Sequence, residues 1–263
     1  QTGGTNYPAG DTGWGQEIDL DVQMVSAACP NCHILLVEAN SASYTDLGAA
    51  VNEAARLGAN AISNSYGGRE FSSEGTATYD GPYNHPGIAV TVSSGDNGYG
   101  VEFPAASQYV TAVGGTSLSE PAKGVWSQTA WSGAGSGCSA YIAPTTWQPR
   151  FSGCSHRIVA DVSAVADPNT GVAVYDSYGS SGGNDWMVFG GTSVASPIIA
   201  STYALAGNSG SIANGSFPYA HTSSLTDVVG GSNGRCKVKA LCTAVTGYDG
   251  PTGLGTPNGA GAF

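Results

Sequence analysis

Ser193 lies in the run Gly190-Gly-Thr-Ser-Val-Ala-Ser-Pro197, between a strand-like apolar stretch and a helical stretch of small residues. A serine at such a junction is close to backbone N–H groups and to the positive end of the helix, which together can stabilise an oxyanion. The tight turn into the helix needs the preceding glycines. The arrangement indicates a nucleophilic serine, although Thr and Ser at this place are also good helix N-caps.

Glu17 and Asp21 are carboxylates four residues apart in a segment with helical periodicity. This spacing places them on one helix face. The pair either belongs to a solvated acidic face, since Asp19 is adjacent, or shares protons and has split pKa values. In the second case Glu17 takes the proton of a serine hydroxyl as general base, and Asp21 orients and charges it. A carboxylate base works at pH values where imidazole is protonated, which predicts activity in acid.

Asp96 follows a predicted strand, in the run Ser93-Ser-Gly-Asp-Asn-Gly98. Gly-Asp-Asn-Gly is a common sequence for the turn that ends a strand. In a doubly wound sheet, however, the carboxyl ends of the strands form the active crevice. A protonated Asp96 there can donate a hydrogen bond to an oxyanion, and it can do so only while the carboxyl keeps its proton.

The run Gly-Thr-Ser-x-x-x-Pro is the serine signature of the subtilisins and of their relatives, the sedolisins. A subtilisin also needs a base in a His-Gly-Thr context and an upstream Asp-Ser/Thr-Gly, and this sequence has neither. Its histidines are followed by Ile, Pro, Arg and Thr; they are His33, His85, His156 and His221. A subtilisin-like enzyme with a histidine base is therefore excluded.

In this order, the three segments resemble the sedolisin family of serine-carboxyl peptidases, over nearly the whole chain. The resemblance implies that Ser193 is the nucleophile, Glu17 the base, Asp21 its partner and Asp96 the oxyanion-hole residue. It implies a serine-type peptidase, an endopeptidase or a tripeptidyl-peptidase, that cleaves a protein or peptide substrate through an acyl-enzyme.

The resemblance extends to the edge Ser65-Tyr66-Gly67-Gly68, where Ser65, Tyr66 and Gly67 are expected to bind the substrate. Members of the family usually carry Trp at the position of Tyr66. A tyrosine keeps an aromatic wall near the active carboxylates but changes its hydrogen bonding.

A calcium site near the C-terminal end is also implied by the resemblance. The family pattern places on one Ca²⁺ ion the side chains of Asp227 and Asp249 and the main-chain carbonyls of Val228, Val245 and Gly247. Oxygen ligands of this kind suit Ca²⁺, although two ordinary acidic loops have the same composition. An ion that clamps a loop-rich end contributes to the stability of the fold.

Strands alternate with helices along the first part of the chain, which indicates an α/β, subtilisin-like fold with a doubly wound, mostly parallel sheet flanked by helices. No repeat or linker divides the 263 residues, so we expect a single domain over 1–263. The expected helices are 17–28, 44–58, 74–84 and 193–206, and the expected strands are 33–38, 61–65, 88–93, 109–113, 125–131, 159–165, 172–178 and 186–189, the last two forming a hairpin around 179–183. The tail from residue 207 is expected to be rich in loops.

The resemblance also points to a further chain. Family domains have a first strand and a helix before the segment that holds Glu17, whereas sixteen residues precede it here. A missing central strand would leave backbone groups unpaired in a buried sheet. We therefore expect a separate N-terminal chain, cut from the same precursor, to remain bound and complete the sheet.

The composition excludes some partners. Eight Lys and Arg against nineteen Asp and Glu give a net charge of −11, which argues against a nucleic-acid partner. The apolar runs are too short and interrupted to cross a membrane. Charged residues make up only 10% of the chain, which fits an acidic extracellular surface or, because few carboxylates can be protonated, a fold adapted to acid.

The six cysteines form three pairs that are close in sequence. Cys29-Pro-Asn-Cys32 has redox CxxC spacing, but it follows a predicted helix, whereas a redox cysteine opens one. Structural disulfides and a secreted protein are the favoured interpretation. The expected pairs are Cys29 with Cys32, Cys138 with Cys154, and Cys236 with Cys242.

One competing function is a non-catalytic homologue or inactive fragment, which would keep the fold as a binding or structural domain. The late start of the sequence favours it. The presence of all four catalytic candidates argues against it.

Overall fold

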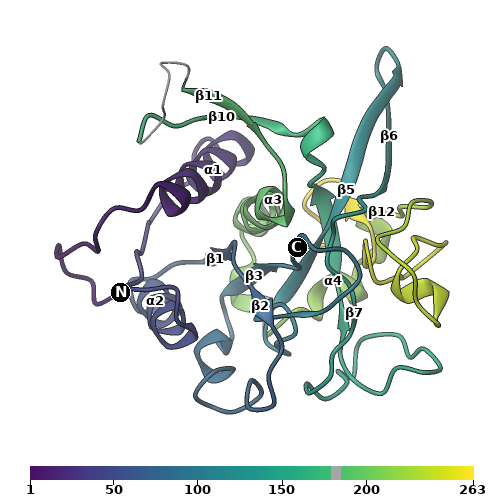
Figure 1. Cartoon of the computed structure of the whole chain (residues 1–263), viewed down its shortest axis with the longest axis horizontal. Coiled ribbons are helices and arrows are strands. Elements are labelled where there is room, and N and C mark those ends of the chain that lie inside the picture. The colour runs from purple at the N-terminus through teal and green to yellow at the C-terminus, as the bar shows by residue number, and fades with distance from the viewer. Residues whose placement is uncertain (179–184) are drawn as a thin grey trace.

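Five strands form the central sheet of the protein, whose computed structural model describes residues 1–178 and 185–263 (Figure 1). The parallel strands are β1 (Ala61–Asn64), β3 (Ala89–Ser93), β5 (Thr111–Ala122) and β9 (Val162–Val165), and the antiparallel strand is β6 (Val125–Ala130). The order across the sheet is β1-β3-β5-β6, and β9 also pairs with β5. The expected α/β fold with a mostly parallel sheet is confirmed.

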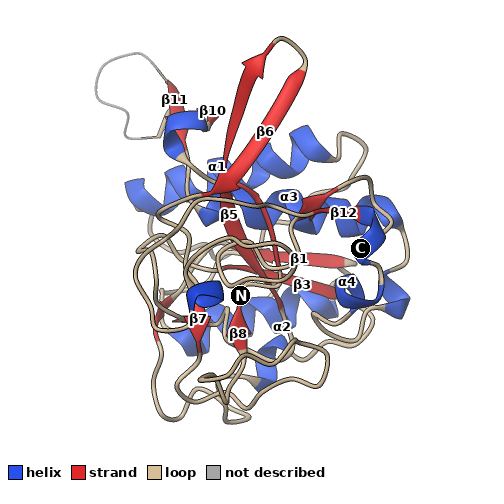
Figure 2. Cartoon of the chain, turned by 90° about the vertical axis from the view of Figure 1, so that its right-hand side faces the viewer, coloured by secondary structure: helices blue, strands red, loops and turns tan. Residues whose placement is uncertain are grey.

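Helices cover both faces of this sheet (Figures 1 and 2). They are α2 (Tyr44–Arg56) on one face, α3 (Thr192–Ala206) on the other, and α1 (Thr12–Ala28), which packs on α3. Successive side chains of a strand point to opposite faces. In β3, Val90 and Val92 therefore join the apolar cluster of Val51 in α2, whereas Ala89 joins the cluster of Ile199 in α3.

The remaining elements are short and lie in the connections. They are β2 (Gly68–Arg69) with β4 (Glu102–Phe103), β7 (Gly137–Cys138) with β8 (Ile158–Val159), β10 (Val172–Tyr175) with β11 (Trp186–Phe189), β12 (Leu225–Thr226) with β13 (Thr256–Pro257), the short helix α4 (Phe217–Ala220), and 3₁₀ turns at Gly81–Tyr83, Pro168–Thr170, Ser209–Ser211, Thr222–Ser224 and Lys239–Leu241. The hairpin of β5 and β6 projects from the body of the molecule (Figure 2). The tail after α3 is rich in loops, as expected.

The strand predicted over 33–38 is wrong, because this segment pairs with no strand among the described residues. Leu35 and Leu36 are each 48% exposed. A cavity of about 1070 Å³ is lined both by residues 31–42 and by residues 59–66, which include the edge strand β1. The segment has the composition of a strand, but it forms no strand pairing because the cavity separates it from the edge strand β1.

The helix predicted over 74–84 is also wrong. This stretch consists of turns followed by a 3₁₀ turn at Gly81–Tyr83. Gly75 and Gly81 lower helix propensity, and Pro82 lacks the N–H that a helix interior needs.

Other predicted elements are present with shifted ends. Helix α1 begins before the expected 17–28 because Asp11 caps it, accepting a hydrogen bond from the backbone of Trp14 at 2.9 Å. The strand expected over 159–165 is divided between β8 and β9, and the first strand of the expected hairpin ends at Tyr175. The two hairpin strands do pair, and the expected loop at 179–183 lies outside the described residues.

The three expected disulfides are present, joining Cys29 to Cys32, Cys138 to Cys154 and Cys236 to Cys242. Among the helices of the described part of the chain, none has the length and apolar character to cross a membrane.

Candidate active site

Ser193 lies in the first turn of α3, directly after the turn that connects this helix to β11. The turn residue Gly191 is the N-cap of α3 and has a φ of 104°, which favours glycine. A Cβ at this position would lie 2.6 Å from Oδ2 of Asp96. Only a glycine therefore lets the acidic loop after β3 approach the start of the serine helix this closely.

Asp96 accepts hydrogen bonds at the N-terminus of α3. Its Oδ1 accepts from the backbone N–H of Thr192 at 2.7 Å and from the Thr192 hydroxyl at 2.9 Å. The same hydroxyl accepts from the backbone N–H of Gly95 at 3.1 Å. Thr192 therefore holds Oδ1 of Asp96 and leaves Oδ2 for another partner. The sequence did not predict this role of Thr192, and its only signal was the position of Thr192 next to Ser193.

Glu17 extends from α1 to the nucleophile candidate, and its side chain is hydrogen-bonded to Ser193. Burial raises the pKa of Glu17, the hydrogen bond from Ser193 lowers it, and the charge of Asp96 raises it, with a net increase. Oε1 of Glu17 is buried and has no hydrogen-bond partner among the described residues. A carboxylate in this setting can accept a proton from the serine hydroxyl.

Asp21 lies one helical turn beyond Glu17 on the same face of α1. Burial and the charge of Glu17 raise the pKa of Asp21 to about 8, against the lowering effect of a hydrogen bond from Ser65. That bond joins the Ser65 hydroxyl to Oδ1 of Asp21 at 2.6 Å. Asp21 therefore holds its proton to a higher pH than an exposed aspartate does.

The expected substrate edge lies next to these carboxylates. Ser65 is nearly buried, and its hydroxyl lies 3.3 Å from the backbone oxygen of Ser193 as well as bonding to Asp21. Tyr66 is half-buried and donates its hydroxyl to Oδ1 of Asn64 at 2.8 Å, while Gly67 is exposed. Ser65 thus belongs to the carboxylate network, and Asn64 is a further polar neighbour that the sequence did not single out.

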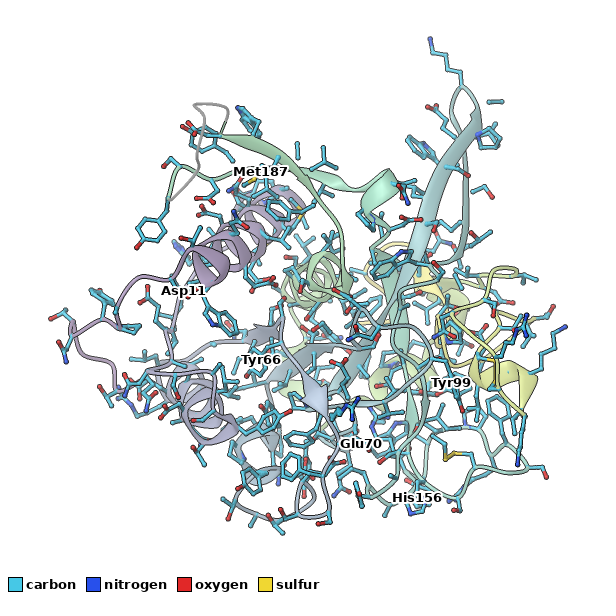
Figure 3. All side chains as sticks on the ribbon, viewed as in Figure 1. Asp11, Tyr66, Glu70, Tyr99, His156 and Met187 are labelled. Carbon is cyan, nitrogen blue, oxygen red and sulfur yellow. A yellow bond between two sulfur atoms is a disulfide. The ribbon has the colours of Figure 1, made fainter. Side chains whose placement is uncertain are left out.

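No histidine takes part in this network among the described residues. His221 bonds to the backbone oxygen of Phe217 at 2.8 Å, and His156 pairs with the Ser155 hydroxyl. Figure 3 shows His156 in a loop on the side of the molecule away from α1, whose start is marked by Asp11. The titratable side chain that contacts Ser193 is a carboxylate, Glu17.

The five expected calcium ligands lie on two loops that contact each other. Oδ2 of Asp227 accepts from the N–H of Gly247 at 2.8 Å, and Oδ2 of Asp249 accepts from the N–H of Val245 at 3.0 Å. The buried Val228 follows Asp227 in the chain. Burial and the charge of Asp227 contribute to raising the pKa of Asp249 to about 7.

The donor set fits a hard cation, because it combines two carboxylates with backbone carbonyls. Neither Asp227 nor Asp249 forms an ion pair with a Lys or Arg in the described part of the chain. No group of three or more His, Cys, Asp or Glu side chains with metal-binding geometry occurs among the described residues, and this site offers only two.

Residues 6–213 match the subtilase family. The chain is 29% identical to kumamolisin of Bacillus sp. strain MN-32 and 31% identical to sedolisin of Pseudomonas sp. strain 101. The two alignments cover 98% and 97% of this chain, respectively. It covers 52% and 50% of these two proteins, so it spans about half the length of the curated relatives it matches.

A solved structure shows the same relationship. Pseudomonas sedolisin, a serine-carboxyl proteinase complexed with two molecules of pseudo-iodotyrostatin, superposes with a TM-score of 0.80 at 30% identity, over 98% of this chain and 80% of that chain. A lanthipeptide protease with a TM-score of 0.63 is only 16% identical and supports the fold alone.

Proposed function

Because this chain belongs to the subtilase family and, within it, to the sedolisins, we propose that it is an acid-acting serine-carboxyl peptidase that hydrolyses peptide bonds. One observation carries the proposal: the side chain of Glu17 is hydrogen-bonded to Ser193 in a site without histidine. A nucleophile in contact with a base is the arrangement that covalent catalysis requires.

The chemistry follows from these contacts. Glu17 takes the proton of the Ser193 hydroxyl as the oxygen attacks the peptide carbonyl. The protonated Glu17 then delivers this proton to the departing amine as the C–N bond breaks, which leaves an acyl ester on Ser193. Glu17 then deprotonates a water molecule that attacks the ester. It returns this proton to the Ser193 oxygen as the ester C–O bond breaks and the carboxylic acid leaves. Asp21, protonated, donates a hydrogen bond that orients Glu17.

Asp96 supplies the oxyanion hole in this proposal. Thr192 occupies Oδ1 with two hydrogen bonds. A proton on Oδ2 would be directed at the developing negative charge beside the start of α3, where the helix dipole adds to the stabilisation. Ser65, Tyr66 and Gly67 line the approach for the peptide substrate.

The test is an activity profile from about pH 3 to about pH 8 on a quenched peptide library, comparing the protein with Ser193→Ala and Glu17→Gln. Activity that peaks in acid and disappears in both variants supports the mechanism. Glu120→Gln, an exposed carboxylate on the projecting hairpin, is the matched control and should behave as the unmodified protein. Activity retained by Glu17→Gln would assign the base to another group.

A structural calcium ion is part of the proposal. Asp227 and Asp249 would bind it through their side chains, and Val228, Val245 and Gly247 through their carbonyls, by the family pattern. The two carboxylates already hold the 245–249 loop by hydrogen bonds, and a cation there would remove their mutual repulsion.

We also propose that a further polypeptide segment, a processed N-terminal chain of the same precursor, occupies the cavity beside β1. Unpaired backbone at the edge of β1 and the half-exposed Leu35 and Leu36 favour an added strand as occupant. Native mass spectrometry of secreted material should find this chain with a smaller companion. An active, folded sample of this chain alone would contradict the proposal. The three disulfides support secretion.

The competing function, a non-catalytic domain that keeps the fold, has one observation in its favour, the large cavity. Loss of all activity in the complete complex, with calcium present, would favour it over the peptidase.

A further inference from the structure

The hairpin of β10 and β11 connects the two halves of the candidate active site. It lies over α1, which carries Glu17, and its second strand leads through Gly190 and Gly191 into Ser193 (Figure 1). Figure 3 shows Met187 of β11 above this helix. Any contact that holds α1 against the hairpin therefore also sets the distance between base and nucleophile.

Two contacts of this kind do not depend on pH. The side-chain amide of Gln23 in α1 donates to the backbone oxygen of Tyr175 at 2.7 Å, and it accepts from the N–H of the same residue at 2.9 Å. Tyr178 covers the first turn of the helix, where a Cβ on Gly15 would lie 3.1 Å from its ring.

A third contact joins two carboxyl groups. Asp176 is fully buried; its Oδ1 accepts from the N–H of Tyr178 at 2.7 Å, and its Oδ2 has no hydrogen-bond donor among the described protein groups. The carboxyl of Asp19, one turn before Gln23 on α1, is hydrogen-bonded to Asp176. A hydrogen bond between two carboxyl groups needs a proton on one of them, because two ionised carboxylates have no proton to donate.

The surroundings offer no cation to replace that proton. Neither Asp19 nor Asp176 forms an ion pair with Lys or Arg in the described part of the chain. The charged groups nearby are acidic: Glu17 and Asp21 on α1, and Asp185 on the hairpin, whose carboxylate accepts from the hydroxyl of Tyr175 at 3.0 Å. Residues 179–184 contain no titratable side chain.

We propose that Asp19 and Asp176 share a proton, and that this bridge is a positioning device which holds α1 against the hairpin in acid and releases it as the pH rises. Once both carboxylates are ionised they repel each other across the contact, and Glu17 moves relative to Ser193. The proposal deepens the proposed function, because it adds a second, non-catalytic reason for acid-dependent activity.

Burial and the charge of Asp176 raise the pKa of Asp19, in agreement with a shared proton. The folded protein thus holds this proton at pH values where the unfolded chain has lost it, and unfolding releases it. Stability contributed by the bridge is therefore present in acid and is lost as the pH rises above the pKa of the unfolded carboxyl.

Asp19→Asn tests the bridge, because an amide donates a hydrogen bond to Asp176 at any pH. We expect the alkaline limb of the activity profile to move upward by about one pH unit, with activity at the acid optimum nearly unchanged. The thermal unfolding midpoint should also fall less between acid and neutral pH than it does in the unmodified protein. Asp176→Asn, which supplies the donor from the other side, should reproduce both effects.

Asp185→Asn is the matched control, since this carboxylate lies on the same hairpin and bonds to Tyr175; it should leave both profiles unchanged. The proposal is overturned if the unfolding midpoints of Asp19→Asn and Asp176→Asn follow those of the unmodified protein at every pH. The unfolding measurement needs no catalysis. If the protein is inactive but the unfolding midpoints of the two variants depend less on pH than that of the unmodified protein, the bridge is supported and the proposed function is rejected.

Discussion

Two clusters that contain buried carboxylates, one around Asp161 and one formed by Glu17 and Asp21, are neutralised in opposite ways. At the start of β9, Asp161 is fully buried and bonds to the guanidinium of Arg157 at 2.6 Å, to the N–H of Ala112, to Gln148 and to Tyr219. Glu17 and Asp21 are also largely buried, but no cation contacts them among the described residues. A cation satisfies the first cluster at every pH, whereas only a proton can neutralise the second.

This difference separates a carboxylate with a permanent charge partner from one that can change its own charge. A buried charge with a permanent partner fixes the backbone around it, and removing the partner leaves an uncompensated charge. A buried carboxyl without a cation has a raised pKa and changes its charge within the working pH range. The predictions below follow from the contrast, and each can be tested by changing one cluster and comparing it with the other.

Glu17→Gln should have the largest effect of these variants. It should lower activity without lowering the stability of the fold. Loss of the base should lower kcat/KM by about 10⁴-fold, by analogy with other triads that lose one member. Because the change also removes a buried ionisable group that has no cation, the unfolding midpoint at neutral pH should stay equal or rise. Peptide hydrolysis and differential scanning calorimetry check the two expectations. If Glu17→Gln is inactive because it is unfolded, Glu17 is needed for the fold, and the contrast with Asp161 is wrong.

Arg157→Met should have the reverse effect. It leaves Asp161 buried with no cation, which costs about 3–5 kcal/mol of unfolding free energy. Denaturant titration should show this loss. The double variant Arg157→Met with Asp161→Asn should recover part of the stability. Equal stability of the single variant and the unmodified protein would show that the guanidinium is not what neutralises Asp161.

Asp96→Ala should lower kcat by about 10²- to 10³-fold, the usual cost of one oxyanion-hole donor. KM should change little, because the hydrogen bond forms in the transition state. Thr192→Val removes the hydroxyl that holds Oδ1 of Asp96 and should give a smaller decrease of the same kind. A change confined to KM would assign Asp96 to substrate binding instead.

The proximity of Glu17 and Asp21 was easier to predict from the sequence than that of Arg157 and Asp161, for a physical reason. Glu17 and Asp21 are four residues apart on a regular helix, and helix geometry alone brings them together. Arg157 and Asp161 have the same spacing, but Arg157 directly precedes β8 and Asp161 directly precedes β9, so their contact depends on packing that no local pattern encodes. The network of Gln148 and Tyr219 around Asp161 is equally non-local.

The incorrect predictions have a related origin. Apolar composition predicted a strand over 33–38, but a strand is defined by its partner, and here a cavity lies beside the segment. The sequence could not predict that Ser65 donates a hydrogen bond to Asp21, because the two residues lie on different elements: Ser65 directly follows β1, and Asp21 lies in α1. The turn at Gly191 and the position of Ser193 were predictable, since the glycines and the small-residue helix are contiguous.

Calcium removal should affect stability more than chemistry. If the ion binds Asp227 and Asp249 as proposed, saturation at about one hundred times the dissociation constant contributes about 2.7 kcal/mol. Chelation by EDTA should lower the unfolding midpoint, and added Ca²⁺ should restore it. Asp227→Asn should abolish this dependence on Ca²⁺. An unfolding midpoint that does not respond to EDTA in the unmodified protein would reject the site.

Ser65→Ala should have the smallest effect. It tests most directly how protonation of the Glu17 and Asp21 pair controls activity. The hydroxyl of Ser65 stabilises the ionised form of Asp21, so its removal should raise the pKa of Asp21 further above about 8. Asp21 would then keep its proton to higher pH, and the alkaline limb of the activity profile should move upward by less than about one pH unit. Ser63→Ala is the matched control on β1, because this hydroxyl pairs with Ser196.

The same deletion in the other cluster should have no such effect. Tyr219→Phe removes a neutral donor from Asp161 but leaves the guanidinium of Arg157, which stays charged throughout the accessible pH range. The activity profile of Tyr219→Phe should therefore superpose on that of the unmodified protein, with only a loss of stability of about 1–3 kcal/mol. An upward shift of the acid limb in Ser65→Ala, with the alkaline limb unchanged, would mean that activity requires ionised Asp21, and the order in which the two active-site carboxyls ionise would have to be reversed.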